Sequence, residues 1–144
     1  MDVNTILRNK GRSVAMIHSA ATIERAVALL RTKGIGALIV SDDGKSVDGI
    51  ISERDIVDAL ALYGEDLLAL EVGEVMTRPA VTCSPDDSVA ELMAEMTNRR
   101  IRHLPVVRNG TLYGIVSIGD LVKSRLDEIE YEAHSMRSFI AGAA

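Results

Sequence analysis

The chain has 144 residues, of which 47% are hydrophobic and 3% aromatic, and its formal net charge is −5 at pH 7. This length fits one compact domain or two very small ones, and without tryptophan the core must be built from aliphatic side chains. The acidic balance disfavours a general nucleic-acid-binding protein, whose surface would be basic, although Arg99, Arg100 and Arg102 form a local basic cluster.

The first half of the chain alternates between helix and strand signals. Thr22 suits the N-cap of a long helix, and Gly34 suits its C-terminal end. Two short runs rich in β-branched residues follow and are joined by the turn Ser41-Asp-Asp-Gly44. The predicted elements are a helix over residues 2–9, a strand over 14–17, a helix over 22–33, strands over 37–40 and 47–51, and a helix from Ser52.

The second half shows the same order of elements. Ser84-Pro-Asp86 is typical of a helix start, and Asn109-Gly110 predicts a hairpin turn. The predicted elements are a strand near residues 80–82, a helix after Asp86, strands over 103–107 and 112–116, and a last helix from Ser117 that continues past Arg125. Short helices are expected over residues 63–78, between the two halves.

The two halves therefore repeat one pattern, β-α-β-β-α. Val89 follows Ile23 by 66 residues, and Gly114 follows Gly49 by 65 residues. A unit of about 55–60 residues buries too little surface to be securely stable alone, so we expect the two repeats to share a core. The predicted fold is an α/β module with pseudo-twofold symmetry. Its predicted parts are an N-terminal extension and first repeat over residues 1–63, a linker over 64–79, and a second repeat with a C-terminal helix over 80–144.

The compartment is predicted from what the sequence lacks. Cys83 is the only cysteine, which excludes an intramolecular disulfide and fits a reducing compartment. No apolar run approaches the roughly 18–20 residues of a membrane span. The first ten residues are amphipathic and lack the apolar core of a signal peptide. We therefore expect a cytoplasmic protein without a membrane segment.

One motif occurs in both repeats, as Gly49-Ile-Ile-Ser-Glu-Arg-Asp55 and as Gly114-Ile-Val-Ser-Ile-Gly-Asp120. A Ser followed three residues later by an acid is a capping box at the start of a helix. The alternative is a ligand site, because a carboxylate there suits the neutral diol of a ribose better than a phosphate. Phosphate on the same ligand would then be held by Arg54, Arg102 and His103. Duplication copies structure as well as function, so both interpretations stay open.

No arrangement of residues indicates catalysis. The sequence lacks a nucleophile–base pair and a Gly-rich phosphate loop. His18, His103 and His134 do not have metal-ligand spacing, so no metal cofactor is expected. Cys83 has no base or second thiol nearby in sequence, so we expect it to be structural. The predicted protein is not an enzyme.

The repeated motif, Glu74-Val-Met-Thr-x-Pro79, Ser84-Pro-Asp86 and Arg99-Arg-Ile-Arg-His-Leu-Pro-Val-Val107 together resemble a tandem cystathionine-β-synthase-type (CBS) domain pair. This arrangement is also called a Bateman module, and the likeness to stand-alone bacterial members covers about residues 4–123. The resemblance implies a ligand-sensing module that binds adenine nucleotides, such as AMP, ATP or NAD(H), in clefts between the repeats. It also implies a homodimer formed through helical faces.

The resemblance assigns candidate nucleotide-binding residues. Ser52 and Asp55 belong to one cleft and Ser117 and Asp120 to the other, with each hydroxyl and carboxylate at the ribose. The other candidates are Lys10, His18, Ala20, Gly36, Ala37, Leu38, Arg54, Thr82, Ser84, Arg102, His103, Leu104, Pro105 and Gly119. The middle strand of the first repeat has Ala37 where the second has His103, so the clefts are expected to differ in affinity.

Three functions follow from these observations. The first is a non-enzymatic module that senses an adenine nucleotide. The second is a regulatory protein–protein interaction module that acts on an unknown enzyme or transporter, with nucleotide as the switch. The third is nucleic-acid binding through the arginine cluster, which the acidic net charge disfavours.

Overall fold

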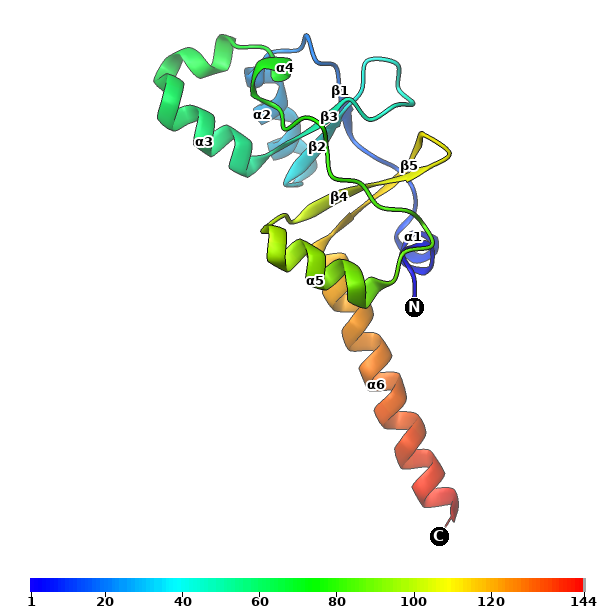
Figure 1. Ribbon diagram of the computed structural model, residues 1–144. Helices are drawn as coiled ribbons and strands as arrows, with labels where there is room; N and C mark the ends of the chain where they lie inside the picture. The colour runs from blue at the N-terminus through cyan, green and yellow to red at the C-terminus, as the bar shows by residue number, and fades with distance from the viewer. Residues whose placement is uncertain (144) are drawn as a thin grey trace.

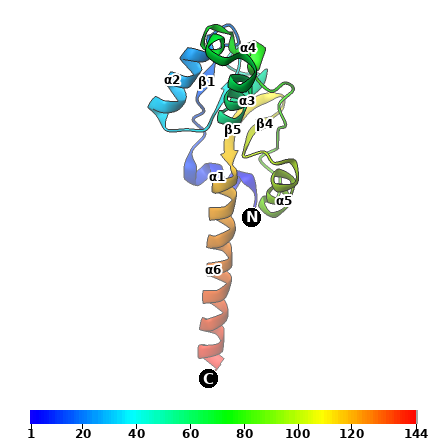
Figure 2. The ribbon, with the colours of Figure 1, turned by 90° about the vertical axis from the view of Figure 1, so that its left-hand side faces the viewer.

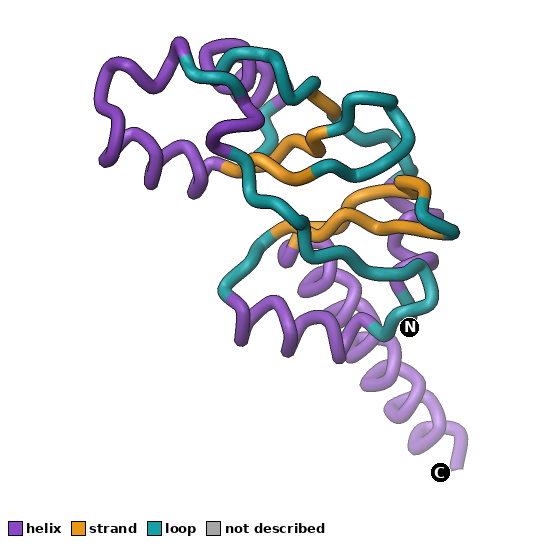
Figure 3. Tube along the Cα trace, turned by 45° about the horizontal axis from the view of Figure 1, so that its top comes forward, coloured by secondary structure: helices purple, strands orange, loops and turns teal. Residues whose placement is uncertain are grey.

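Two small β-sheets, one from each repeat, lie at the middle of the molecule, and most helices cover their outer sides (Figures 1 and 3). The computed structural model describes residues 1–143. The expected α/β architecture with two related repeats is confirmed.

The first repeat forms the three-stranded sheet, in the order β1-β2-β3. Strand β1 runs parallel to β2, and β2 is antiparallel to β3. The Thr22 hydroxyl accepts a hydrogen bond from the Arg25 amide at the start of α2, and Gly34 ends that helix with φ of 62°. Both predicted helix ends are thereby confirmed. The elements are β1 (Met16–Ile17), α2 (Ile23–Lys33), β2 (Ala37–Val40), β3 (Gly49–Ser52) and α3 (Glu53–Tyr63).

The second repeat forms a two-stranded antiparallel sheet of β4 and β5. Asn109 and Gly110 both have positive φ, 52° and 74°, as the predicted hairpin turn requires. Helix α5 begins after the N-cap Ser88 rather than directly after Asp86, because Ser84 to Asp87 form a separate turn. The elements are α5 (Val89–Arg99), β4 (His103–Arg108), β5 (Thr111–Ser117) and α6 (Ile118–Ala143).

The strand expected near residues 80–82 does not form; a single parallel bridge joins Cys83 to Val106 instead. Pro105 explains the difference. In the first repeat, the Ile39 amide donates a hydrogen bond to the Ala15 carbonyl at 3.1 Å. Pro105 occupies the position equivalent to Ile39 and has no N–H to donate to Val81, so the ladder ends one step earlier.

The short helices expected between the repeats are confirmed as η1 (Gly64–Ala69) and α4 (Val72–Val75). The helix that precedes each repeat packs on the other repeat. Helix α1 (Val3–Lys10) contributes Val3, Ile6 and Leu7 to the core of the second repeat, and α4 contributes Val72 to the core of the first. The Val3 amide donates to the Asp87 carbonyl at 3.1 Å, and the Val72 amide donates to the Ala21 carbonyl at 2.8 Å.

The buried side chains form two clusters, one in each repeat, so the expectation of one shared core is wrong. The reason is that the helices of each repeat lie on the outer side of its own sheet (Figure 3), and the buried side chains of each cluster come from that sheet and those helices. The two repeats are joined because α1, which precedes the first repeat, packs on the second, and α4, which precedes the second repeat, packs on the first. We call this arrangement the exchange of α1 and α4.

Helix α6 is the longest element, and the prediction that it continues past Arg125 is confirmed. Its first turns pack against α5, and the rest projects away from the body (Figures 1 and 2). Of the helices in residues 1–143, none combines the length and the apolar character that a membrane crossing requires.

Candidate ligand-binding cleft between the repeats

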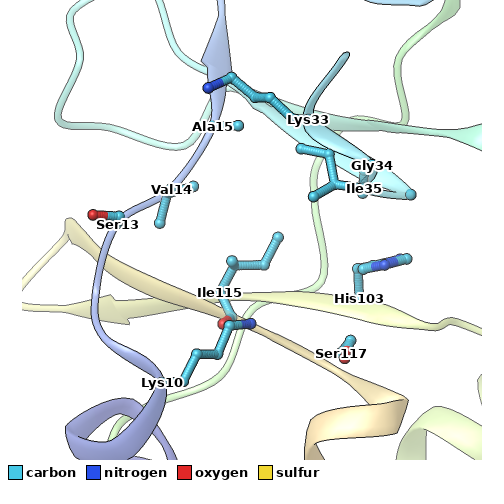
Figure 4. Close-up of a pocket in the computed structure, with 12 residues that line it drawn as sticks. Lys10, Ser13, Val14, Ala15, Lys33, Gly34, Ile35, His103, Ile115 and Ser117 are labelled. Atoms are coloured by element: carbon cyan, nitrogen blue, oxygen red, sulfur yellow. The ribbon is translucent and has the colours of Figure 1, made fainter. Parts of the chain in front are cut away.

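A cavity of about 650 Å³ lies between the two repeats, a volume typical of small-molecule sites. Figure 4 shows side chains from both repeats around it. The first part of the chain contributes Lys10, Ser13, Val14, Ala15, Lys33, Gly34, Ile35, Gly36 and Ala37, and the second repeat contributes His103, Ile115 and Ser117.

Lys10 and the motif of the second repeat meet at one side of this cavity. The Lys10 ammonium donates hydrogen bonds to Asp120 Oδ2 at 2.6 Å and to the Ile115 carbonyl at 2.9 Å. The Ser117 amide also donates to Asp120 Oδ2 at 2.9 Å, and the Asp120 amide donates to Ser117 Oγ at 3.1 Å. Ser117 and Asp120 therefore form a capping box at the start of α6, with a lysine added to it.

The charge of Asp120 is stabilised in this arrangement. Burial acts to raise the pKa of Asp120, but the hydrogen bonds from Lys10 and from the Ser117 amide outweigh it, so the pKa lies below its usual 3.8. Asp120 is thus ionised at neutral pH. A carboxylate with two oxygens retains lone pairs beyond the bonds to Lys10 and Ser117. Asp120 itself does not line the cavity, but its hydrogen-bond partners Lys10 and Ser117 do.

The motif of the first repeat has a neutral partner in place of the lysine. The Ser52 amide donates to Asp55 Oδ2 at 2.8 Å, which forms the capping box of α3. The Thr77 hydroxyl donates to Asp55 Oδ1 at 2.7 Å. Capping, one of the two interpretations of the repeated motif, is therefore correct in both repeats, and the two carboxylates differ in charge environment.

Gly36 and His103 are in close contact where β2 and β4 begin. A Cβ atom on Gly36 would lie 3.0 Å from His103 Cε1 and 3.0 Å from Glu53 Oε1. Glycine at position 36 therefore makes room for the imidazole at the cavity wall. Burial, together with the nearby charge of Arg102, lowers the pKa of His103 below its usual 6.5. The imidazole is consequently neutral at pH 7, and Lys10 and Lys33 are the cations among the residues that line the cavity.

The two predicted phosphate-binding arginines lie elsewhere. Arg54 donates a hydrogen bond to the Arg100 carbonyl at 3.2 Å, so it caps the C-terminal end of α5. Arg102 is exposed and does not line this cavity. Its position in the first repeat is occupied by Gly36.

Of the other predicted residues, Lys10, Gly36, Ala37, His103 and Ser117 are brought together by the cavity. His18 and Ala20 are not: His18 Nδ1 accepts from the Ala20 amide and lies 3.3 Å from Asp42, beyond the far end of β1. The side chains of Leu38 and Leu104 fill the cores, and Pro105 is also buried. Thr82, Ser84 and Gly119 do not line the cavity either; Ser84 belongs to the turn before α5.

Sequence reasoning missed Ser13, Val14, Ala15, Lys33, Gly34, Ile35 and Ile115. Ile115 had a usable signal, because residues two apart on a strand share a face and Ser117 was already a candidate. The segment before β1, Ser13 to Ala15, had no such signal, because the local sequence does not indicate which end of a short parallel strand lies next to the other repeat.

Metal and thiol chemistry find no support here. Within residues 1–143, no group of three or more His, Cys, Asp or Glu side chains is placed to hold a metal ion. Cys83 is buried, and burial raises the pKa of its thiol to about 12, so the thiol stays protonated.

Known proteins share both the sequence pattern and the fold. The CBS domain profile matches residues 10–62 and 72–127. The CBS domain-containing protein CBSX3, mitochondrial, of Arabidopsis thaliana is 30% identical over 97% of this chain and 72% of its own length. The crystal structure of the CBS-domain containing protein ATU1752 from Agrobacterium tumefaciens is similar with a TM-score of 0.83 and 42% identity, over 87% of this chain and 99% of that one.

A second similar structure contains ligands. It is the CBS domain pair of protein MJ0100 in complex with 5'-methylthioadenosine and S-adenosyl-L-methionine, with a TM-score of 0.74 and 29% identity, over 90% of this chain and 98% of that one. The profile matches each repeat separately, at the positions where the two related folds lie. The chain therefore belongs to the CBS-domain family, as a tandem pair of CBS domains.

Proposed function

We propose that this protein is a non-enzymatic sensor that binds an adenosine-containing ligand in the cleft between its two CBS repeats. The observation that carries the proposal is the ionised Asp120, which is hydrogen-bonded to Lys10, one of the residues that line a cavity of about 650 Å³. The adenosyl ligands of the MJ0100 pair support this chemical class.

In this proposal each part of the ligand meets a matching part of the cleft. Asp120 accepts hydrogen bonds from the ribose diol, as a free carboxylate lone pair allows. Val14, Ile35 and Ile115 provide apolar surface for the adenine base. Lys10 and Lys33 provide positive charge for a phosphate or a carboxylate on the same ligand. AMP, ATP and NAD(H) fit these requirements, and a reducing cytoplasm fits the free thiol of Cys83.

The output of such a sensor is a change in contact with another protein. Helix α3 leaves apolar side chains open to solvent, with exposures of 63% at Val57, 52% at Leu60 and 80% at Leu62. Surface of this kind is typical of interaction sites. We therefore also propose that ligand binding regulates a partner enzyme or transporter, and that helical faces including α3 contribute to homodimer formation.

Calorimetric titration with adenosine, AMP, ATP, NAD⁺, NADH, S-adenosylmethionine and methylthioadenosine tests the ligand class. We expect at least one to bind with micromolar affinity, and guanosine nucleotides to bind more weakly. If all of them fail to bind at millimolar concentration while the protein is folded by circular dichroism, the proposed function is wrong.

A further inference from the structure

The outer part of α6 has no partner among the described residues. Ser124 is the last buried residue of the helix, and every side chain from Ile129 to Gly142 is exposed. Residues 125–143 form a rod about 29 Å long at a rise of about 1.5 Å per residue. Figure 2 shows this rod leaving the body without touching another element.

Apolar side chains follow one seam along this rod. Val122, Leu126, Ile129, Ala133, Met136 and Ile140 are separated alternately by four and three residues. This heptad spacing places them on one side of the helix, where a coiled-coil partner would cover them. Leu126, Met136 and Ile140 are 54%, 68% and 63% exposed. Most of the stability of a helix in a protein comes from packing of its apolar face, so the seam favours a covered state.

Charged residues flank the seam, and their order indicates which helix can pair with α6 and whether the pair is parallel or antiparallel. Arg125 and Glu132 precede Leu126 and Ala133, whereas Glu130 and Arg137 follow Ile129 and Met136. In a parallel pair of identical helices, a residue before one seam position faces the residue five places later on the partner. Arg125 then faces Glu130 of a second copy, and Glu132 faces Arg137 of that copy. Four of the five flanking charges thus meet an opposite charge, and the fifth, Lys123, faces the apolar Ile118 of the second copy.

An antiparallel pair with the whole seam overlapped has the reverse pattern. Glu132 would meet Glu132 of the second copy, Glu130 would meet Glu130, and Arg137 would meet Lys123. Like charges in these positions are unfavourable, and an antiparallel register shifted by one heptad leaves two of the six seam positions uncovered. The charge pattern therefore matches this helix to itself in the parallel direction.

We propose that α6 joins copies of this chain as a parallel coiled coil over residues 122–140, with a second copy as the smallest assembly. Both bodies then lie at the same end of the coil. This inference does not depend on the identity of the ligand or on the contacts of α3.

The assembly is tested by measuring the mass of the full chain by light scattering at micromolar concentration. The double variant Ile129→Glu, Met136→Glu places charge in the seam at exposed positions. The matched control is Tyr131→Glu, Ser138→Glu, which adds the same charge on the outer side of the same helix. We expect the seam variant to have a lower mass and less helix by circular dichroism, and the control to keep the mass of the wild type. A monomeric wild type, or a seam variant that keeps both the mass and the helix content of the wild type, would overturn the proposal.

The direction is tested by disulfide crosslinking in a Cys83→Ser background. Met136→Cys places two thiols in the same layer of a parallel pair, so we expect a covalent dimer on a non-reducing gel. The control Ser138→Cys points outward and should stay uncrosslinked. An antiparallel pair places Met136 beside Leu126, so a folded, self-associated Met136→Cys protein that does not crosslink would overturn the parallel arrangement.

Charge exchange gives an independent test of the same pairing. Arg137→Glu puts two acids opposite each other in the parallel pair and should weaken association severalfold. The double variant Glu132→Arg, Arg137→Glu restores opposite charges and should recover it. Tighter association of Arg137→Glu alone is the outcome expected for the antiparallel pair, because it removes the contact with Lys123, and it would contradict the proposal.

Discussion

Lys10 and Asp120 are 110 residues apart in the chain, yet the Lys10 ammonium donates a hydrogen bond of 2.6 Å to Asp120 Oδ2. This contact joins the end of α1 to the first turn of α6 at the edge of the cleft. A ligand that uses Asp120 therefore binds next to a cation that is already in place. In the first repeat, the hydroxyl of Thr77 replaces that cation beside Asp55.

The first prediction concerns Lys10→Met. We expect this change to weaken the binding of AMP by about 1 kcal/mol, or roughly fivefold, because a partly exposed cation contributes modestly to phosphate binding. The affinity for adenosine should stay nearly unchanged. Calorimetry with both ligands measures the difference. Lys45→Met, in the exposed turn before β3, is the matched control and should have no effect. Equal losses for AMP and adenosine would show that Lys10 acts by shaping the cleft.

The second prediction separates ribose binding from helix capping. Asp120→Asn should cost about 1.5–3 kcal/mol of affinity for AMP, because a charge-assisted hydrogen bond is lost, and should cost much less for 2'-deoxy-AMP. Both Asp120→Asn and Asp55→Asn weaken a capping box, so each should lower stability by about 1 kcal/mol. Calorimetry beside thermal melts distinguishes the two roles. If Asp120→Asn lowers only the melting temperature, Asp120 is a cap and nothing more.

The role of Asp55 is read from the stoichiometry of the same titrations. One bound ligand per chain in the Asp55→Asn protein, against two in the wild type, would show that the motif of the first repeat serves a second cleft. An unchanged stoichiometry would confine binding to the cleft at Asp120.

The third prediction is a pH dependence of stability caused by His103. Its folded-state pKa is lowered below 6.5 by burial and by Arg102, so the unfolded chain takes up a proton first as the pH falls. Stability should therefore decrease from about pH 6.5 down to the folded-state pKa and level off below it. Urea unfolding at a series of pH values measures this slope. His103→Gln should reduce the slope in that window, and an unchanged slope would assign it to other groups.

The same titration affects ligand binding. Because the imidazole lines the cleft, its protonation below the lowered folded-state pKa should improve binding of phosphorylated ligands relative to adenosine. The ratio of the AMP and adenosine affinities at two pH values tests this, with His103→Gln as the control.

The fourth prediction concerns the close approach of Gly36 and His103. Gly36→Ala places a Cβ 3.0 Å from the imidazole and should destabilise the protein by about 1–3 kcal/mol. His103→Ala in the same chain removes the crowded atoms and should recover part of that loss. A double-mutant cycle of unfolding free energies measures the coupling. Additive effects would show that the contact with Glu53, and not that with His103, limits position 36.

Local chemistry was sufficient to predict most elements. Thr22 and Gly34 mark the ends of α2 because each supplies a group or a conformation that a helix end requires, and Asn109-Gly110 supplies the positive φ of the hairpin turn. The loss of the first strand of the second repeat was not predicted. It depends on the register that aligns Pro105, which has no N–H, with the carbonyl of Val81, and register is a property of the sheet.

The site was predicted less completely than the fold. The repeated motif identified Ser117 and Asp120, whose arrangement depends on residues three apart. The lining by Ser13, Val14 and Ala15 depends on which end of β1 faces the second repeat, and His18, at the opposite end, was selected instead. The periodicity of α1 and α4 predicts that each helix buries an apolar face, but it does not indicate against which repeat that face packs.

The exchange of α1 and α4 sets the order in which the chain can complete its cores. Val3 and Leu7 are synthesised before the first repeat, but their neighbours Leu92, Val116 and Leu121 come after the whole of it. In a nascent chain that ends within α3, the second repeat on which α1 packs has therefore not yet been made, and the core of the first repeat still lacks Val72. Because such distant contacts must form before either core is closed, we expect the two repeats to fold as a single cooperative unit, and slowly for a chain of this size.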